Sequence, residues 1–458
     1  MKNPIFVPEL RELLKKKKFS IIKSFLEVNH PKEIAEYLAL LNPNEIWKIL
    51  DLVDIYSQVD IFKYFEIDVQ VELVAGSMRT RIMELLKELS PDSRADLFDN
   101  LEKDMADRLL LLLPIKERAD VLNLTSYNEK SAGSIMTTDH AILNERDTVE
   151  HAIRKVRKEA PSRETIYYIY VIDDDGRLIG FVTLEKLILS KPRQHIRDIM
   201  KSEIIYASTE DDQEYAAKLI DEYDLLALPI VDKKDRLMGI VTYDDAMDVI
   251  HEEHTEDMER LMAISGEVVD KPYLDIPAFV HFKKRAFWVI ILALLGLVTG
   301  LIVKSYQNVL EVLIVLAFYM PMLNATGGNT GSQSASVVIR SLALNELTFS
   351  NVWQVVKKEL QISLMLSLCL GVIVFIRVLI FTSSDIPPTI SIDSVALVIS
   401  ISLALQVVWS TTLGAAVPLL ASKLKVDPAL VSSPLLATLV DMGGIFIYFS
   451  VAKLILNI

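Results

Sequence analysis

The sequence predicts an α-helical polytopic membrane protein with five transmembrane helices, preceded by a cytosolic all-α N-terminal domain and an α/β domain made of a tandem repeat. Three observations lead to this prediction. Residues 282–458 contain several long apolar runs, and residues 131–250 contain two similar strand-and-helix segments. In residues 1–130, apolar side chains recur only at helical spacing.

Charge is distributed unevenly along the 458 residues. Residues 282–458 hold 11 Lys and Arg against 7 Asp and Glu, so residues 1–281 hold the other 37 basic and 55 acidic residues. This acidity argues against nucleic acid as a partner, because phosphates need basic side chains, and it favours cations. The one cysteine, Cys369, excludes disulfides and thiolate metal clusters. Residues 1–18 have no apolar signal core, so we expect the front part in the cytosol.

Residues 1–130 are predicted to form short helices that stack as a small solenoid, with an ordinary helical bundle as the alternative. Prolines suited to helix starts divide the segment at Pro31, Pro43, Pro91 and Pro114. A weak repeat of 24 residues relates Arg94 to Arg118. Asp92 and Asp96 are four residues apart and therefore lie on one helix face.

Residues 131–250 contain two units of about 60 residues, each with the order strand, helix, strand, strand, helix. Residues 168–183 are echoed by residues 227–242, and both units resemble a cystathionine-β-synthase-type (CBS) pair. Such pairs regulate an attached enzyme or channel and often bind adenosine nucleotides, so the resemblance makes ATP a candidate ligand. In that family an acid six residues after a Gly-x-x-Thr glycine can hold a ribose. Asp245 has this position in the second unit, whereas Lys186 departs from the pattern in the first.

A connecting segment, residues 243–281, begins with a long acidic helix over residues 243–265. Acids follow one another at helical spacing, in two series: Asp244, Asp248, Glu252 and Glu256, and Glu253 with Asp257. Like charges at this spacing destabilise a helix by a few tenths of a kcal/mol per pair. Arg260 is the first Lys or Arg after Arg236, so the acids have little neutralising charge nearby. Bound cations are one interpretation, and a solvated helix face is the other.

Five membrane spans are expected in residues 282–458, each with the roughly 20 helical residues that cross hydrocarbon. They are residues 286–303, 309–323 with its polar continuation, 362–381, 395–420 and 434–456. Basic residues precede the first span and lie in the loops after the second and fourth spans. The positive-inside rule then places the N-terminus in the cytosol and the C-terminus outside.

A polar segment, Pro321 to Gln333, interrupts the second apolar run. Its neutral oxygens come from Asn324, Thr326, Asn329, Thr330 and Gln333, and Gly328 lies among them. In hydrocarbon such groups must face protein or water, and proline with paired glycines indicates a kinked or broken helix that lines an ion path. Alternatively, Gly327 and Gly331 form a packing seam of the small-xxx-small type.

Asp441 lies inside the last apolar run. A carboxylate there is costly and by default indicates a functional site, the alternative being a salt bridge to Arg377 in the third span. Asp427, which precedes Pro428 in a cytosolic loop, is suited to cap a helix.

The order of these parts and two motifs resemble the MgtE family of magnesium transporters. Residues 321–333 resemble the signature of that family's second span, although Ser332 replaces an asparagine, and residues 427–441 resemble its fifth-span segment. The resemblance implies a homodimeric, Mg²⁺-selective channel in the cell membrane that cytosolic Mg²⁺ closes. It implies Asp441 as the pore carboxylate. The regulatory acids that it implies are Asp92, Asp96, Asp212, Glu214, Asp224, Asp245, Asp248, Glu253, Glu256, Asp257 and Asp427.

The chemistry of Mg²⁺ agrees with this function. Mg²⁺ dehydrates reluctantly, so one or two carboxylates can hold it through its waters while neutral amides bind the water shell. The sequence has no Gly-x-x-x-x-Gly-Lys-Ser/Thr loop, so we expect conduction down the electrochemical gradient and no enzymatic activity. Two alternatives are a transporter of Co²⁺, Mn²⁺ or Ca²⁺, and a nucleotide sensor whose spans serve as an anchor.

Overall fold

The computed structural model describes residues 6–76, 79–160, 163–266, 268, 273–274, 276–343, 346–382, 386–387, 390–428 and 433–457. It divides into two compact units, Met1–His251 and Glu252–Ile458. Parts of the segments predicted at 243–281 and 427–441 lie outside the described residues.

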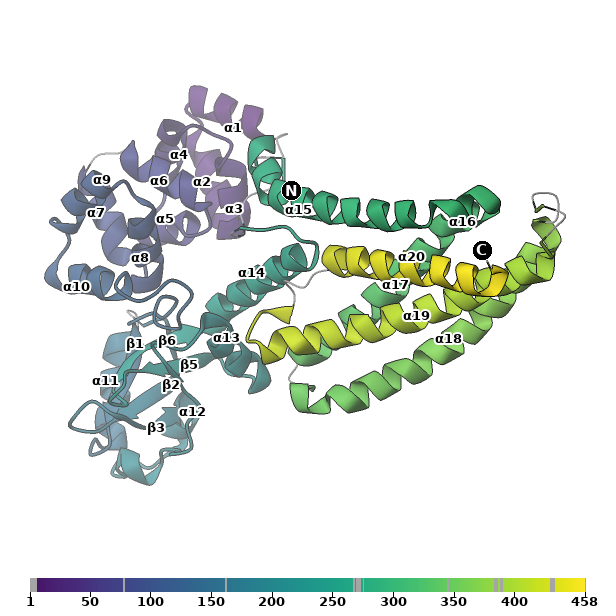
Figure 1. The fold of residues 1–458 in the computed structure, drawn as a ribbon. Coiled ribbons are helices and arrows are strands. Elements are labelled where there is room, and N and C mark those ends of the chain that lie inside the picture. Colours follow the sequence, from purple (N-terminus) through teal and green to yellow (C-terminus); the bar gives the residue numbers. More distant parts are fainter. Residues whose placement is uncertain are drawn as a thin grey trace. The chain divides into compact units, whose positions relative to one another are not determined.

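The first unit begins with ten short helices (Figure 1). Their bounds are α1 Phe6–Lys15, α2 Phe19–Val28, α3 Pro31–Leu38, α4 Pro43–Leu50, α5 Ile55–Phe62, α6 Ile67–Ala75, α7 Arg79–Glu88, α8 Pro91–Asn100, α9 Lys103–Leu110 and α10 Ile115–Leu124. Each helix from α3 to α6 contacts the second helix after it, as does α8, so odd and even helices form two rows around one apolar core. This layering is that of a solenoid rather than of a compact bundle.

The helix starts follow from the local sequence. Pro31, Pro43 and Pro91 occupy the first turn of α3, α4 and α8, where a missing N–H costs no hydrogen bond. Asn42 accepts a hydrogen bond from the Glu45 N–H, and the Glu45 carboxylate accepts one from the Asn42 N–H, which completes a capping box.

The repeat of 24 residues has a physical cause in two arginines. Arg94 donates hydrogen bonds to the carbonyls of Leu86, Lys87 and Leu89, at the end of α7. Arg118 donates to three carbonyls displaced by the same 24 residues, those of Leu110, Leu111 and Leu113 at the end of α9. Each arginine therefore satisfies the carbonyls that the end of a helix leaves unpaired.

Two three-stranded sheets follow in the same unit (Figure 1). The first contains β1 His140–Asn144, β2 Thr165–Ile172 and β3 Leu178–Thr183, with helices α11 Val149–Glu159 and α12 Leu184–Leu189. The second contains β4 Ala207–Ser208, β5 Ala227–Val231 and β6 Leu237–Thr242, with α13 Gln213–Glu222 and the start of α14 Tyr243–Leu261. In both sheets the first pair of strands is parallel and the second antiparallel, so the predicted tandem repeat is confirmed.

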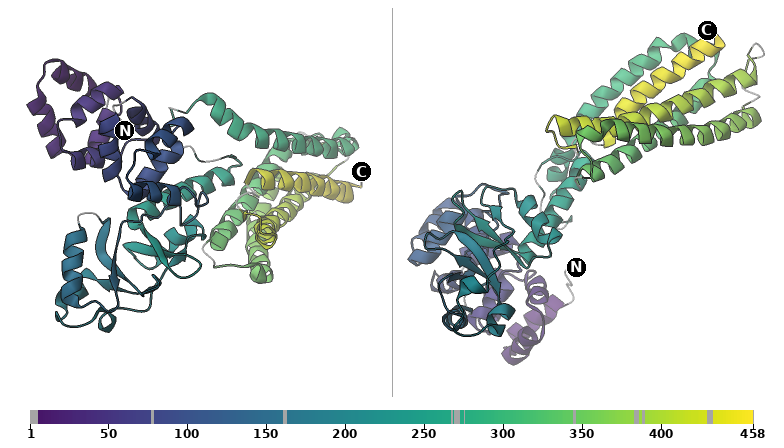
Figure 2. Two further views of the ribbon diagram at one scale, coloured as in Figure 1. Left: turned by 90° about the vertical axis from the view of Figure 1, so that its left-hand side faces the viewer. Right: turned by 90° about the horizontal axis from the view of Figure 1, so that it is seen from below.

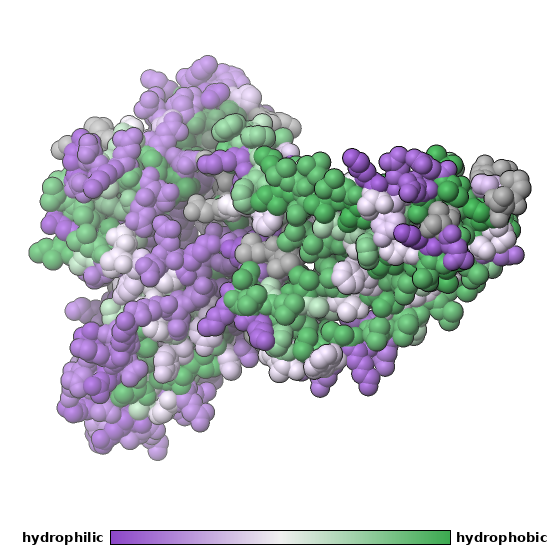
Figure 3. Space-filling model, viewed as in Figure 1, coloured by the Kyte–Doolittle hydropathy of each residue, from purple (hydrophilic) through white to green (hydrophobic). Residues whose placement is uncertain are grey.

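The second unit consists of long helices, α15 Ala278–Ser305, α17 Val315–Ala343, α18 Val352–Phe381, α19 Ile392–Lys423 and α20 Ser433–Leu456, with a short α16 Gln307–Val312 (Figures 1 and 2). Helices α17, α19 and α20 pack against one another, and α18 packs along α19. Hydrophobic residues cover much of the surface of these helices (Figure 3). The membrane-protein class predicted from the sequence is confirmed.

By length and hydropathy, four helices among the described residues qualify as membrane spans, rather than the five expected. The helix that does not qualify is α17. Its 29 residues measure about 43 Å, which is long enough to cross the hydrocarbon, but its amides, hydroxyls and glycines lower its hydropathy.

The sequence predicts a kinked or broken helix at the proline and glycines of the second span, and a break there is wrong. Helix α17 runs without interruption from Val315 to Ala343, through Pro321 and all three glycines. The interruption lies earlier, at Leu313, whose φ of −141° and ψ of 81° end α16. Backbone hydrogen bonds inside α17 therefore satisfy the peptide groups of the polar segment, and its side chains carry the chemistry.

Replacing Arg94 by alanine should destabilise the helical domain by about 3 kcal/mol, because a buried cation and its bonds to three carbonyls are lost. Urea-dependent pulse proteolysis of the full chain measures this change. Arg108→Ala is the matched control, since Arg108 is exposed and its guanidinium donates to Asp104 within the same helix. Equal stability of the two variants would contradict the capping role of Arg94.

Candidate functional site

Helix α17 has two faces with different roles. The buried face contains Leu323, Gly327, Gly331, Ser334 and Val338. The opposite face is exposed on the single chain and includes Ala325, Asn329, Gln333 and Arg340. The amides of this second face are out of place beside hydrocarbon, because lipid offers them no hydrogen bonds.

The packing-seam interpretation holds for two of the three glycines. A Cβ on Gly331 would lie 3.2 Å from the Ser410 carbonyl of α19, and a Cβ on Gly414 would collide with the Gly331 backbone. A Cβ on Gly327 would lie 3.0 Å from Val440 of α20. Gly328, in contrast, has open space where its Cβ would be. Gly327 and Gly331 thus allow close helix contact, and Gly328 is not needed for it within one chain.

The Thr330 hydroxyl, expected as a pore oxygen, takes part in helix packing. It lies 2.7 Å from the Ser410 hydroxyl of α19 and also donates to the Thr326 carbonyl. Thr326 in turn donates to the Met322 carbonyl. Asn324 differs, because its buried Oδ1 has no hydrogen-bond partner among the described residues.

Asp441 is half-buried on α20 and directly follows Val440, which contacts Gly327 and Gly331. The alternative, a salt bridge between Asp441 and Arg377, is not formed among the described residues. The Arg377 guanidinium lies 5.2 Å from the centre of the Tyr319 ring, and Asp441 forms no ion pair with any described residue. Asp441 is therefore a carboxylate within a membrane helix, level with the polar segment of α17.

Helix α19 carries a polar stripe that the sequence analysis did not predict. Ser402, Gln406 and Ser410 recur every four residues inside an apolar span, and all three are fully buried. This spacing places them on one helix face, which is the signal that could have revealed them. Gln406 stands out, because neither atom of its amide has a partner among the described residues.

Asp427, expected to cap a helix or to bind a cation, forms an ion pair with the end of α14. The Arg260 guanidinium lies 2.9 Å from the Asp427 carboxylate and also pairs with Glu256. Lys284 of α15 pairs with Glu259 at 2.7 Å. Protein cations therefore neutralise part of the acidic series on α14, within the second unit.

In the first unit, acids from two domains approach one another. Burial and the nearby Asp92 raise the pKa of Asp245 to about 8, although its carboxylate accepts a hydrogen bond from the Thr242 hydroxyl. Burial, together with the charges of Asp92 and Asp99, also raises the pKa of Asp96, to about 7. The Asp92 Oδ1 is buried and has no partner among the described residues. These three acids form the acidic cluster.

Glu164 is a fourth member of the acidic cluster that sequence reasoning missed. Burial and the charge of Asp92 raise the pKa of Glu164, and Asp244 adds to this effect. Glu164 lies just before β2, and only the fold brings it near α8. Its sequence surroundings give no sign of this contact.

The predicted regulatory acids of α13 lie at or near its two ends. Asp212 caps α13 by accepting a hydrogen bond from the Glu214 N–H, and Glu214 pairs with Lys218. Asp224 follows the far end of α13, about 15 Å away by helix rise. The acids predicted on α14 are Asp248, Glu253, Glu256 and Asp257. Among the described residues, no group of three or more His, Cys, Asp or Glu side chains is arranged to hold a metal directly.

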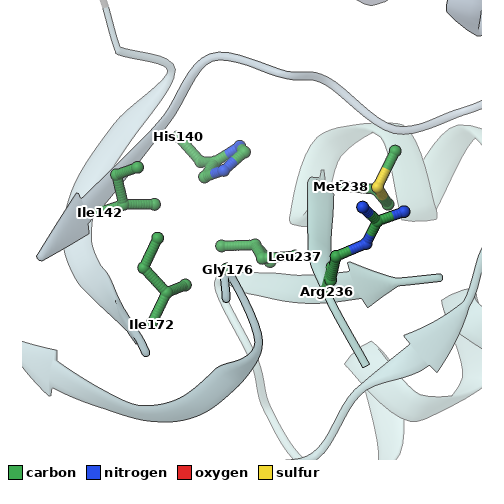
Figure 4. A pocket seen from close by; sticks show the side chains of 7 residues that line it. All are labelled: His140, Ile142, Ile172, Gly176, Arg236, Leu237 and Met238. Carbon is green, nitrogen blue, oxygen red and sulfur yellow. The ribbon is translucent and has the colours of Figure 1, made fainter. Parts of the chain in front are cut away.

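Two hollows lie in the tandem repeat. The first, of about 270 Å³, is lined by His140 and Ile142 of β1, Ile172 of β2, Gly176, and Arg236 to Met238 (Figure 4). The second, of about 360 Å³, is lined by Thr183, Lys186 and Lys201 among others. Lys186 therefore faces a hollow, whereas Asp245, the acid expected at a ribose, belongs to the acidic cluster.

Family models match most of the chain. A model described as MgtE, divalent cation transporter, matches residues 320–451, and a model of the MgtE intracellular N domain matches residues 29–130. The CBS domain model matches residues 132–191 and 196–252.

Similar proteins agree with these matches. The magnesium transporter MgtE of Thermus thermophilus is 37% identical over 98% of each chain. The magnesium transporter MgtE of Bacillus subtilis is 30% identical over 96% of this chain and 95% of its own. A crystal structure of the cytosolic domain of the Mg²⁺ channel MgtE in complex with ATP shares 36% identity with a TM-score of 0.50, covering 52% of this chain and 98% of that one.

The acidic cluster should make the first unit less stable as the pH rises. A carboxyl whose pKa is higher in the folded state than its ordinary 3.8 stabilises the fold at low pH, and this contribution is lost as the pH rises through about 8. In the presence of a chelator, we expect a loss on the order of 1 kcal/mol between pH 6 and pH 8.5. Asp245→Asn should flatten this dependence in thermal unfolding, while Asp175→Asn, in an exposed turn, should not.

Proposed function

The chain belongs to the MgtE family of divalent cation transporters, and from this premise we propose that it conducts Mg²⁺ into the cell and that cytosolic Mg²⁺ closes it. The observation that carries the proposal is Asp441, a membrane-helix carboxylate without an ion-pair partner among the described residues, level with the polar segment of α17. The relatives are named as transporters, and we propose no enzymatic activity for this chain.

Conduction needs charge compensation without tight binding. One Asp441 from each of two chains would offer two carboxylates to a hydrated Mg²⁺, and the amide of Asn329 would hydrogen-bond its water shell. Entry is favourable at a negative membrane potential, by about 4.6 kcal/mol per 100 mV for two charges. Gly328, with open space beside it, leaves room for those waters.

The exposed face of α17 supports the proposal of a homodimer. Asn329 and Gln333 are exposed on the single chain, and lipid cannot satisfy their amides. A second copy that packs against this face would enclose the amides and create a water-filled path between the two α17 helices. The same residues of the two chains, related by a two-fold axis, would then line one pore.

Closure would come from the acidic cytosolic part. Asp92 and Asp96 on α8, Asp245 on α14 and Glu164 before β2 repel one another when no cation is bound. Mg²⁺ would neutralise this repulsion and favour the compact arrangement. Because a ligand shifts a population only through its different affinity for the two states, the ion must bind the compact state more tightly.

The end of α14 would transmit closure to the membrane helices. Arg260 links Glu256 to Asp427, which lies just before the last helix, so a displacement of α14 would act on the loop that carries Asp427. Glu253 and Asp257 on the same helix would add cation sites to this contact, and Asp212, Glu214 and Asp224 would add sites on the second CBS unit.

ATP is the proposed nucleotide ligand of the CBS pair. The relative of known structure was crystallised with ATP, and the hollow beside Thr183 offers two lysines, Lys186 and Lys201. Lysine replaces the ribose-binding acid there, so we expect phosphate contacts to contribute more than ribose contacts.

We propose the cell membrane as the location, with the N-terminus in the cytosol and the C-terminus outside. The support is the distribution of lysines and arginines at the ends of the spans, with Lys283, Lys284 and Arg285 before the first and Lys423 and Lys425 between the last two.

Asp441→Asn should abolish Mg²⁺ flux in liposomes that contain the purified full chain, while the protein remains folded, because the neutral amide removes the charge that attracts the ion. Uptake of Mg²⁺, Ca²⁺ and Co²⁺ by the wild type tests selectivity in the same assay. Asp393→Asn, at the exposed start of α19, is the control and should conduct normally. Normal flux through Asp441→Asn would exclude Asp441 from the pore.

Millimolar Mg²⁺ should protect the junction at Lys130 from trypsin, because a compact acidic cluster holds α8 against the CBS pair. Lys130 is exposed and lies between α10 and β1. NaCl at equal ionic strength is the control and should not protect. Identical digestion in both salts would contradict Mg²⁺ sensing by the acidic cluster and would leave the pore assignment unaffected.

A further inference from the structure

In the polar stripe of α19, helix packing does not explain why the amide of Gln406 is buried. Ser410 is satisfied, since its hydroxyl donates to the Val407 carbonyl and contacts Thr330. Gln406 is fully buried, and neither its Oε1 nor its Nε2 has a partner among the described residues. A buried amide without hydrogen bonds disfavours the arrangement that encloses it, above all at membrane depth.

Two glycines make the space that Gln406 fills. A Cβ on Gly327 of α17 would lie 3.1 Å from the Gln406 Cδ, and a Cβ on Gly444 of α20 would lie 3.1 Å from its Cγ. The amide is therefore held between the backbones of α17 and α20, at the point where both meet α19. Any larger residue at position 327 or 444 would push this side chain out of place.

This position adjoins the residues of the ion path. Gly444 lies one helical turn after Asp441, and Gly327 precedes Gly328 and Asn329. One turn before Gly327, Asn324 also has a buried oxygen that lacks a partner among the described residues. Unsatisfied amides thus accompany both sides of the contact between α17 and α19.

We propose that Gln406 is a further residue of the ion path, a neutral amide that binds the water shell of a divalent cation when α20 moves away from α17. This rests on the proposed function, because it needs a cation path at Asp441. In the packed arrangement the amide is enclosed and unsatisfied. When the helices part, its carbonyl accepts and its NH₂ donates hydrogen bonds to water, as the shell of a hydrated cation requires.

The same geometry gives Gln406 influence on opening. Hydration of the Gln406 amide favours the state in which α20 has moved away from α17. An apolar side chain of the same length favours the state in which the two helices are packed together. Gln406→Met should therefore lower Mg²⁺ flux about tenfold, the equilibrium equivalent of one buried hydrogen bond, and should raise the melting temperature of the solubilised protein. A residue that only fills space would give unchanged flux.

Water access can be measured directly. In a Cys369→Ala background, Gln406→Cys in the full chain should react with a water-soluble methanethiosulfonate reagent at low Mg²⁺, and its modification should block flux. Leu403→Cys, equally buried on α19, is the matched control and should remain unmodified. Ser367→Ala, which removes a buried hydroxyl of α18 that donates to Ala404, should leave flux unchanged.

The outcomes separate this proposal from the proposed function. Absence of wild-type Mg²⁺ flux would contradict Mg²⁺ transport itself. Wild-type flux together with an unreactive Gln406→Cys, or with unchanged flux in Gln406→Met, would exclude Gln406 from the path and leave transport intact.

Discussion

The cost of placing polar groups in hydrocarbon is the constraint on which the membrane-spanning unit depends. Helix α17 carries amides and hydroxyls and still has the length of a span. It meets the constraint by an unbroken helical backbone and by packing Gly327 and Gly331 against α19 and α20. The hydroxyls of Thr330 and Ser410 donate to carbonyls of their own helices and lie 2.7 Å from each other. Among the described residues, these contacts leave Asn324 Oδ1 and both amide atoms of Gln406 without a hydrogen-bond partner and Asp441 without an ion pair.

In the first unit, the constraint is the cost of burying acids close to one another. Burial, together with the charge of Asp92 on α8, raises the pKa of Asp245 on α14 to about 8, so the fold keeps this carboxyl ionised only at a cost. That cost depends on pH, because it is present only when the carboxyl is ionised. On α14 the opposite solution applies, because Arg260 neutralises Glu256 and Asp427 with a charge from the chain itself. Helix α14 thus carries both Asp245, a buried acid with a raised pKa, and Glu256 and Glu259, which pair with basic side chains.

Several features were predictable because they depend on neighbours in the sequence. The strand order of both CBS units, the helix starts at Pro31, Pro43 and Pro91, and the spans α15, α18, α19 and α20 follow from local periodicity and local sterics. The repeat of Arg94 and Arg118 was also visible, but its cause was not. Each guanidinium reaches the carbonyls of a preceding helix, a contact that only the folded turn creates.

The sequence by itself determined the class of the protein, its family, and the polar character of α17 and Asp441, since composition and motif order carry this information. Only the tertiary structure decided the role of each polar residue. It assigned Thr330 to helix packing, Asp427 to Arg260 and Glu164 to the acidic cluster, and it enclosed Gln406 between two glycines. The physical reason is that hydrogen bonds and charge interactions act over a few ångströms in space, between residues that can be more than a hundred positions apart in the chain.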